Sequence, residues 1–145
     1  MIIEMVMNFN SYLNEEELSR GADKDTQNIV STFLALSTPT QYLDMPAEEQ
    51  LRGIILGSVR DGAYCGVFHI IACANILKQT VVLVYPTYGG AVVYHRMLCR
   101  AFLPRAINQH PSLQRTTHIL FTNVAGVTVA EDDFKVDHFC VMMQR

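Results

Sequence analysis

Residues 61–69 read Asp61-Gly62-Ala63-Tyr64-Cys65-Gly66-Val67-Phe68-His69, a turn sequence followed by the start of an apolar segment. The Asp-Gly pair predicts a tight turn, and the apolar residues after it predict a buried helix over 65–78. Cys65 would open that helix, where unpaired backbone N–H groups and the positive end of the helix dipole favour the thiolate form of a cysteine. This stretch therefore predicts an activated thiol on the central element of the fold.

Helices are expected on the N-terminal side of this stretch. Residues 23–36 carry apolar side chains at helical spacing, with Asp25 or Thr26 as the cap. Pro46, followed by acidic residues, starts another helix that runs to about Val59. The side chains expected on its buried face are Leu51, Ile54, Ile55 and Val59.

Strands are expected on the C-terminal side. The β-branched and apolar segments lie at 80–85, 91–94, 118–122 and 138–142, and residues 102–114 read as irregular. Helices followed by strands indicate an α+β fold, with N-terminal helices and a central helix packed on a small mixed β-sheet. At 145 residues the chain is expected to form a single domain over 1–145.

Composition narrows the functional classes. A net charge of −3, with no long run of Lys or Arg, argues against a nucleic-acid-binding surface. The cysteines form no CxxC pair, so we expect no disulfide framework and an intracellular location, cytoplasmic or nuclear. The opening residues lack a basic region, which makes them a poor signal peptide, and the apolar runs are too short to span a membrane.

A histidine far downstream supplies a candidate base. His138 lies in a strand-like segment, and a general base for a cysteine must be held in one tautomer by a third group. Asp137 adjoins it, but side chains alternate across a strand, and the residue on the same face as His138 is Cys140. The third residue therefore stays open between Asp61 and Asn123.

A metal site on the central helix is not expected. Cys65, His69 and Cys73 lie one turn apart on one face of the predicted helix. Three side chains stacked along a straight helix span too far to converge on one tetrahedral ion. We therefore expect His69 in the core or directly behind the candidate site.

The order of these motifs resembles the ovarian tumour (OTU) family of cysteine proteases, which are chiefly deubiquitinases. The resemblance lies in the Asp61-Gly62 turn, in Cys65 at the start of an apolar helix, and in His138-Phe139 near the end. Segments 64–72 and 84–86 also resemble OTU-like domains of transposon-derived animal proteins. Three departures stand out: one extra residue separates Gly62 from Cys65, the Asn of the family's Asp-Gly-Asn-Cys motif is missing, and Cys140 replaces the polar residue that follows the His-aromatic pair in the family.

The resemblance implies a papain-like OTU fold with Cys65 as nucleophile, His138 as general base and Asp61 as third residue, with Asn123 as the alternative. It implies an oxyanion site at the backbone of Asp61, Gly62 and Tyr64. The implied activity is hydrolysis of the bond after the C-terminus of ubiquitin or a ubiquitin-like modifier, without a cofactor or metal. The missing Asn and the presence of Cys140 support a second hypothesis, a catalytically inactive OTU-like protein-interaction module.

Overall fold

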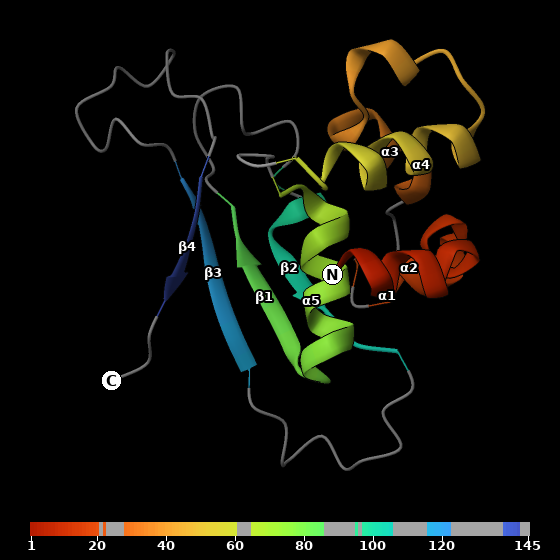
Figure 1. Cartoon of the computed structure of the whole chain (residues 1–145). Coiled ribbons are helices and arrows are strands. Elements are labelled where there is room, and N and C mark those ends of the chain that lie inside the picture. Colours follow the sequence, from red (N-terminus) through yellow and green to blue (C-terminus); the bar gives the residue numbers. More distant parts are fainter. Residues whose placement is uncertain are drawn as a thin grey trace, which may run out of the picture.

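The computed structural model describes residues 1–20, 22, 28–60, 65–85, 95, 97–105, 116–122 and 138–142. Within them, helices come first along the chain and the strands follow, which confirms the predicted α+β class. The helix α5 (Val67–Leu77) lies between the sheet and the N-terminal helices, as the prediction of a central helix requires (Figure 1). None of the described helices is long and apolar enough to cross a membrane.

In the described part of the chain, four strands form one mixed sheet in the order β2-β1-β3-β4. Their bounds are β1 (Thr80–Val84), β2 (Arg100–Phe102), β3 (Thr116–Thr122) and β4 (His138–Met142). β1 runs parallel to β3, whereas β1–β2 and β3–β4 are antiparallel pairs. The strands predicted at 80–85, 118–122 and 138–142 are confirmed, and β2 was not predicted. The strand predicted at 91–94 lies outside the described residues.

The N-terminal helices differ from the prediction mainly at their ends. Their bounds are α1 (Ile2–Met7), η1 (Phe9–Leu13), α2 (Glu15–Ser19), α3 (Ile29–Ser37), η2 (Thr40–Tyr42) and α4 (Ala47–Gly57). The N-cap of α3 is Asn28, with a left-handed φ of 57°, so the helix begins later than a cap at Asp25 or Thr26 predicts; Asp25 and Thr26 themselves lie outside the described residues. Val59 lies beyond the end of α4 and is 65% exposed, so its predicted burial is wrong.

Aromatic side chains join the helices to the sheet. The ring of Phe68 in α5 meets the ring of Phe33 in α3 edge to face, with centroids 6.1 Å apart. Phe33 in turn packs against Phe102 of β2 at 6.3 Å, and Tyr12 of η1 packs against Phe68 at 6.1 Å. All four rings are almost completely buried, and pairs at these separations add stabilisation to that of area burial alone. Phe68 therefore anchors α5 to both α3 and η1, three residues after Cys65.

Arg100 holds the edge strand β2 against the helices. Its guanidinium lies 4.8 Å from the ring centroid of Phe102 and 5.6 Å from that of Phe33, and it donates a hydrogen bond to the carbonyl of Leu18 in α2. Burial lowers the pKa of Arg100 to about 10, because the charged form loses hydration. The two rings and the carbonyl compensate part of that loss, which ties β2 to both α2 and α3.

Candidate active site

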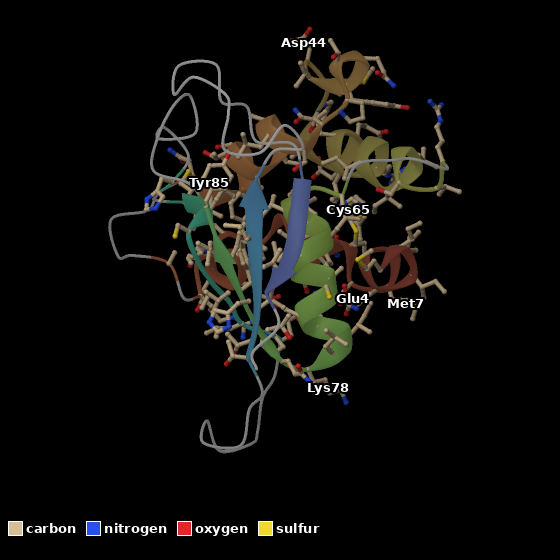
Figure 2. The ribbon with its side chains drawn as sticks, turned by 90° about the vertical axis from the view of Figure 1, so that its left-hand side faces the viewer. Glu4, Met7, Asp44, Cys65, Lys78 and Tyr85 are labelled. Atoms are coloured by element: carbon tan, nitrogen blue, oxygen red, sulfur yellow. The ribbon has the colours of Figure 1, made fainter. Side chains whose placement is uncertain are left out.

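Helix α5 and strand β4 begin at the same end of the molecule. α5 leads through residues 78–79 into β1 and packs on it, so the two run in opposite directions. β3 is parallel to β1 and β4 is antiparallel to β3, so α5 and β4 run the same way. Cys65, just before α5, therefore lies toward the end at which His138 opens β4 (Figures 1 and 2).

Cys65 precedes the helix instead of opening it. α5 begins at Val67 and its N-cap is Gly66 in an extended conformation, so the predicted start at Cys65 is wrong by two residues. The cysteine is a free thiol and is exposed to solvent, at the end of α5 opposite Lys78 (Figure 2). The N–H groups of the first helical turn belong to residues 67–69. Cys65 lies outside that turn and is separated from it by Gly66.

The peptide after Cys65 is held by a buried histidine. His69 is 4% exposed and lies three residues after the N-cap. Its backbone N–H donates to the carbonyl of Gly66 at 3.0 Å, and the N–H of Gly66 donates to Nδ1 of His69 at 3.0 Å. This reciprocal pair has the spacing of a capping box, with an imidazole in place of the usual Glu or Gln.

The other ring nitrogen of His69 reaches the preceding helix. Nε2 lies 2.6 Å from Oγ of Ser58, and Ser58 Oγ donates to the carbonyl of Ile54 at 2.6 Å. Because Nδ1 accepts a hydrogen bond, the ring proton lies on Nε2 and is donated to Ser58, which assigns the tautomer from its partners. Burial lowers the pKa of His69, since the charged imidazolium would lose hydration there. The side chain is therefore a neutral imidazole at neutral pH.

A pocket of about 270 Å³ lies beside this arrangement, where the ends of α3 and α4 meet the start of α5. Its wall includes Ser37, Pro39, Ile54, Ser58, Gly66 and His69. The Oγ of Ser37 is buried and has no hydrogen-bond partner among the described residues. A Cβ atom on Gly66 would lie 3.0 Å from that oxygen, so the absence of a side chain at 66 permits the approach of α3 to α5.

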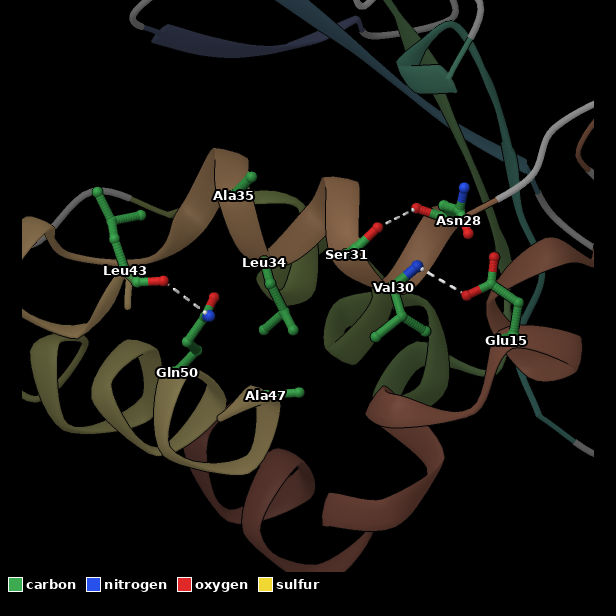
Figure 3. A pocket seen from close by; sticks show the side chains of 9 residues that line it. All are labelled: Glu15, Asn28, Val30, Ser31, Leu34, Ala35, Leu43, Ala47 and Gln50. Atoms are coloured by element: carbon green, nitrogen blue, oxygen red, sulfur yellow. Dashed lines mark hydrogen bonds between the residues drawn. The ribbon is translucent and has the colours of Figure 1, made fainter. Parts of the chain in front are cut away.

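A second pocket, of about 370 Å³, lies between α3 and α4 (Figure 3). Glu15 from α2 lines it and accepts hydrogen bonds from the backbone N–H groups of Ile29 and Val30 at the start of α3. Gln50 spans it to the carbonyl of Leu43. These polar groups already serve the packing of the helices. Among the described residues, no group of three His, Cys, Asp or Glu side chains could hold a metal ion.

The structure describes only some of the site residues predicted from the sequence. Cys65 is described in full, and His138 is described by its backbone, which pairs with Thr122 of β3. The remaining candidates lie outside the described residues: Asp61, Gly62, Tyr64 and Asn123. Sequence reasoning placed His69 in the core or behind the site but missed its partner Ser58. A polar side chain three residues after Gly66 was a signal for the bond between His69 and the Gly66 N–H, but no local pattern pointed to Ser58.

A family model described as the OTU domain of vertnin matches residues 1–122. The chain belongs to this OTU-domain family. The match includes Cys65, α5 and the strands through β3, so the predicted resemblance to OTU domains is confirmed for the part of the chain that contains the thiol. No curated protein and no solved structure matches the chain significantly.

Proposed function

We propose that this OTU domain is a cysteine-dependent hydrolase that cleaves the bond after the C-terminus of ubiquitin or a ubiquitin-like modifier. The observation that carries the proposal is an exposed thiol at Cys65, next to the start of the buried central helix of an OTU domain. The common direction of α5 and β4 supports His138 as its base, since both elements begin at the same end of the molecule.

In the proposed reaction, His138 takes the proton from the Cys65 thiol, and the thiolate attacks the carbonyl of the modifier's C-terminal glycine. Backbone N–H groups of residues 61–65 stabilise the resulting oxyanion. The protonated histidine then gives its proton to the departing amine, which leaves a thioester on Cys65. Water, deprotonated by His138, hydrolyses the thioester and restores the thiol. Asp61 or Asn123 would orient His138, and no cofactor takes part.

An electrophilic probe tests this proposal directly. Ubiquitin that carries a vinyl sulfone at its C-terminus is incubated with the protein, and adducts are followed by mass spectrometry. We expect one adduct on Cys65 in the wild-type protein, none with Cys65→Ala, and at least about a hundredfold slower capture with His138→Ala, since general base catalysis contributes on this order.

Cys73→Ala is the matched control, because Cys73 is a free thiol on α5 that is partly buried. It should leave the rate of capture unchanged. Failure of the wild-type protein to form any adduct with ubiquitin, or with ubiquitin-like modifiers carrying the same electrophile, would overturn the proposed hydrolase activity.

A second candidate function is a non-catalytic OTU module that binds its partner without cleaving it. Two observations favour it: Cys140 stands where the family has a polar third residue, and the N–H of Gly66, adjacent to Cys65, is already bonded to His69. This alternative predicts saturable binding of ubiquitin in calorimetry together with no adduct on Cys65. An adduct in the wild-type protein rules it out.

A further inference from the structure

Cys65 lies in the segment that connects α4 to α5. α4 ends at Gly57, with Ser58 as its C-cap, and α5 begins after its N-cap, Gly66. The side chain of His69 contacts both of these capping residues, at 2.6 Å from Ser58 Oγ and 3.0 Å from the nitrogen of Gly66. The side chain of His69 therefore bridges the C-cap of α4 and the N-cap of α5.

Burial makes this arrangement specific. An imidazole that is almost completely buried destabilises the fold unless its nitrogens are hydrogen-bonded. Both nitrogens of His69 have partners, and each ring nitrogen has a defined role: Nδ1 accepts and Nε2 donates. Rotation or protonation of the ring would break one or both bonds, so the fold is compatible with one orientation and one tautomer.

The bond to Gly66 also bears on the cysteine. The N–H of Gly66 belongs to the peptide plane that contains the carbonyl carbon and Cα of Cys65. Fixing that N–H against Nδ1 fixes the plane and hence the point from which the Cys65 side chain extends. The freedom that remains to the thiol is rotation of Cys65 about its Cα–C bond and of the sulfur about the Cα–Cβ bond.

We propose that His69 is a positioning residue for the Cys65 thiol, acting through the Gly66 peptide and held in place by Ser58. The proposal rests on the proposed function in that Cys65 is taken as the nucleophile. A substrate carbonyl must be attacked from one direction, and displacement of a reacting group by about 1 Å can slow a reaction about a hundredfold. His69 does not touch the substrate and exchanges no proton with it.

Two substitutions of His69 separate positioning from packing. His69→Gln keeps a side chain that can accept the N–H of the N-cap residue from the same helical position, whereas His69→Leu keeps apolar volume and removes the acceptor. Ser58→Ala removes the outer partner. Ser31→Ala is its matched control, because the Ser31 hydroxyl also donates to a backbone carbonyl near a helix end, that of Asn28 at 2.9 Å, without touching a histidine.

The first measurement does not depend on catalysis. Nitrogen NMR of the wild-type protein should show His69 with Nδ1 unprotonated and Nε2 protonated at neutral pH, with the resonance assigned by its loss in His69→Gln. Exchange of the Gly66 amide hydrogen should be at least about tenfold faster in His69→Leu than in the wild type, because one hydrogen bond is lost, and near wild-type in His69→Gln. A protonated Nδ1, or equal exchange in all three proteins, would overturn the proposal.

The second measurement compares two reagents at matched folded fraction. With the ubiquitin vinyl sulfone, His69→Leu should slow capture at least about tenfold, His69→Gln should restore it to within about threefold, and Ser58→Ala should fall between them. Alkylation of Cys65 by iodoacetamide, which approaches from any direction, should change less than about threefold. Equal slowing with both reagents, or no slowing with either, contradicts positioning.

The two measurements also separate this proposal from the proposed function. If the wild-type protein forms no ubiquitin adduct, the hydrolase proposal fails, and the inference about His69 is decided by the tautomer and by the exchange of the Gly66 amide. If the adduct forms but the NMR results contradict the assigned tautomer, the hydrolase proposal stands and His69 is only a packing residue.

Discussion

Gly66 lies close to Ser37 of α3, and this makes position 66 sensitive to even the smallest side chain. Its φ of −91° is open to any residue, so the constraint is space and not backbone strain. A Cβ would lie 3.0 Å from Oγ and 3.4 Å from Cβ of Ser37. We expect Gly66→Ala to lower the free energy of unfolding by about 1–2 kcal/mol, measured by urea denaturation, because α3 must move away from α5.

The contact with Ser37 can be isolated by a double-mutant cycle. Ser37→Gly removes both atoms that the new Cβ would meet, so Gly66→Ala should cost at least about 0.5 kcal/mol less in that background. The part of the cost that comes from the preference of N-caps for glycine over alanine remains in both backgrounds. An identical cost with and without Ser37→Gly would show that the close approach has no energetic consequence.

His69 should make stability depend on pH. Its pKa is lowered in the folded protein by burial, so between that value and the unfolded value of about 6.5 the unfolded chain binds more protons. Its contribution is fully present above about pH 6.5 and is lost as the pH falls toward the folded pKa. Urea midpoints from about pH 8 to about pH 5 should fall less steeply for His69→Gln than for the wild type.

The comparison with His69→Gln cancels the contribution of the other histidines, which both proteins contain. Parallel pH profiles for the two proteins would contradict a neutral, buried His69. A steeper fall of the urea midpoint with falling pH in His69→Gln would mean that another group causes the loss of stability in acid.

At this scale the sequence was informative about chemistry and less so about position. The turn and the apolar run indicated a thiol near the start of a buried helix, and Cys65 is exposed at that place. The helix begins two residues later than predicted, because Gly66 adopts an extended conformation as the N-cap and donates its N–H to His69. The histidine ring is held in place by its contact with Ser58 beyond the end of α4, which no local pattern reveals.

Among the elements, those with a strong local pattern were predicted, whereas α1 and β2 were not. α4, α5 and strands β1, β3 and β4 all carry runs of apolar residues with clear starts. α1 escaped prediction because Ile3 and Met7, which are 80% and 77% exposed, obscure the single buried residue Met5. β2 is three residues long and exists because it pairs with β1, a tertiary effect.

α3 begins with help from another helix. The carboxylate of Glu15 in α2 accepts hydrogen bonds from the N–H groups of Ile29 and Val30, the latter at 3.0 Å (Figure 3). Asn28, the N-cap, makes no side-chain bond of its own to the helix. Glu15 therefore performs the work of an N-cap side chain across fourteen residues of sequence and also places a negative charge at the positive end of the helix dipole.

We expect Glu15→Ala to lower the free energy of unfolding by about 1–2 kcal/mol, the usual loss when an N-cap is removed. Thermal and urea unfolding followed by circular dichroism measure it. Glu16→Ala is the matched control, since Glu16 occupies the same first turn of α2 and is exposed. Equal effects of the two substitutions would mean that the capping bonds of α3 add nothing beyond the charge pattern of α2.

In the whole molecule, the N-terminal helix is tied to the far end of α5 by a polar cluster. Glu4 accepts from the hydroxyl of Tyr12 and pairs with the guanidinium of Arg105, which also lies 5.3 Å from the centroid of the Tyr12 ring. The backbone N–H of Arg105 donates to the side chain of Asn75 in α5 at 2.8 Å. The cluster therefore joins α1, η1, α5 and the segment after β2, at the opposite end of α5 from Cys65.

The cluster should contribute far more to the free energy of unfolding than an exposed ion pair of the same type. The side chains of Arg105 and Glu4 are 20% and 13% exposed, whereas those of Arg52 and Glu49, 3.8 Å apart on α4, are 63% and 47% exposed. Removing one partner of a partly buried pair leaves the other charge desolvated, so we expect Glu4→Gln to lower the free energy of unfolding by about 2–3 kcal/mol. Glu49→Gln should change it by less than about 0.5 kcal/mol, because water and side-chain freedom offset the attraction. Urea denaturation of both variants at one pH and ionic strength measures the difference, and equal losses would mean that α1 is held by apolar burial alone.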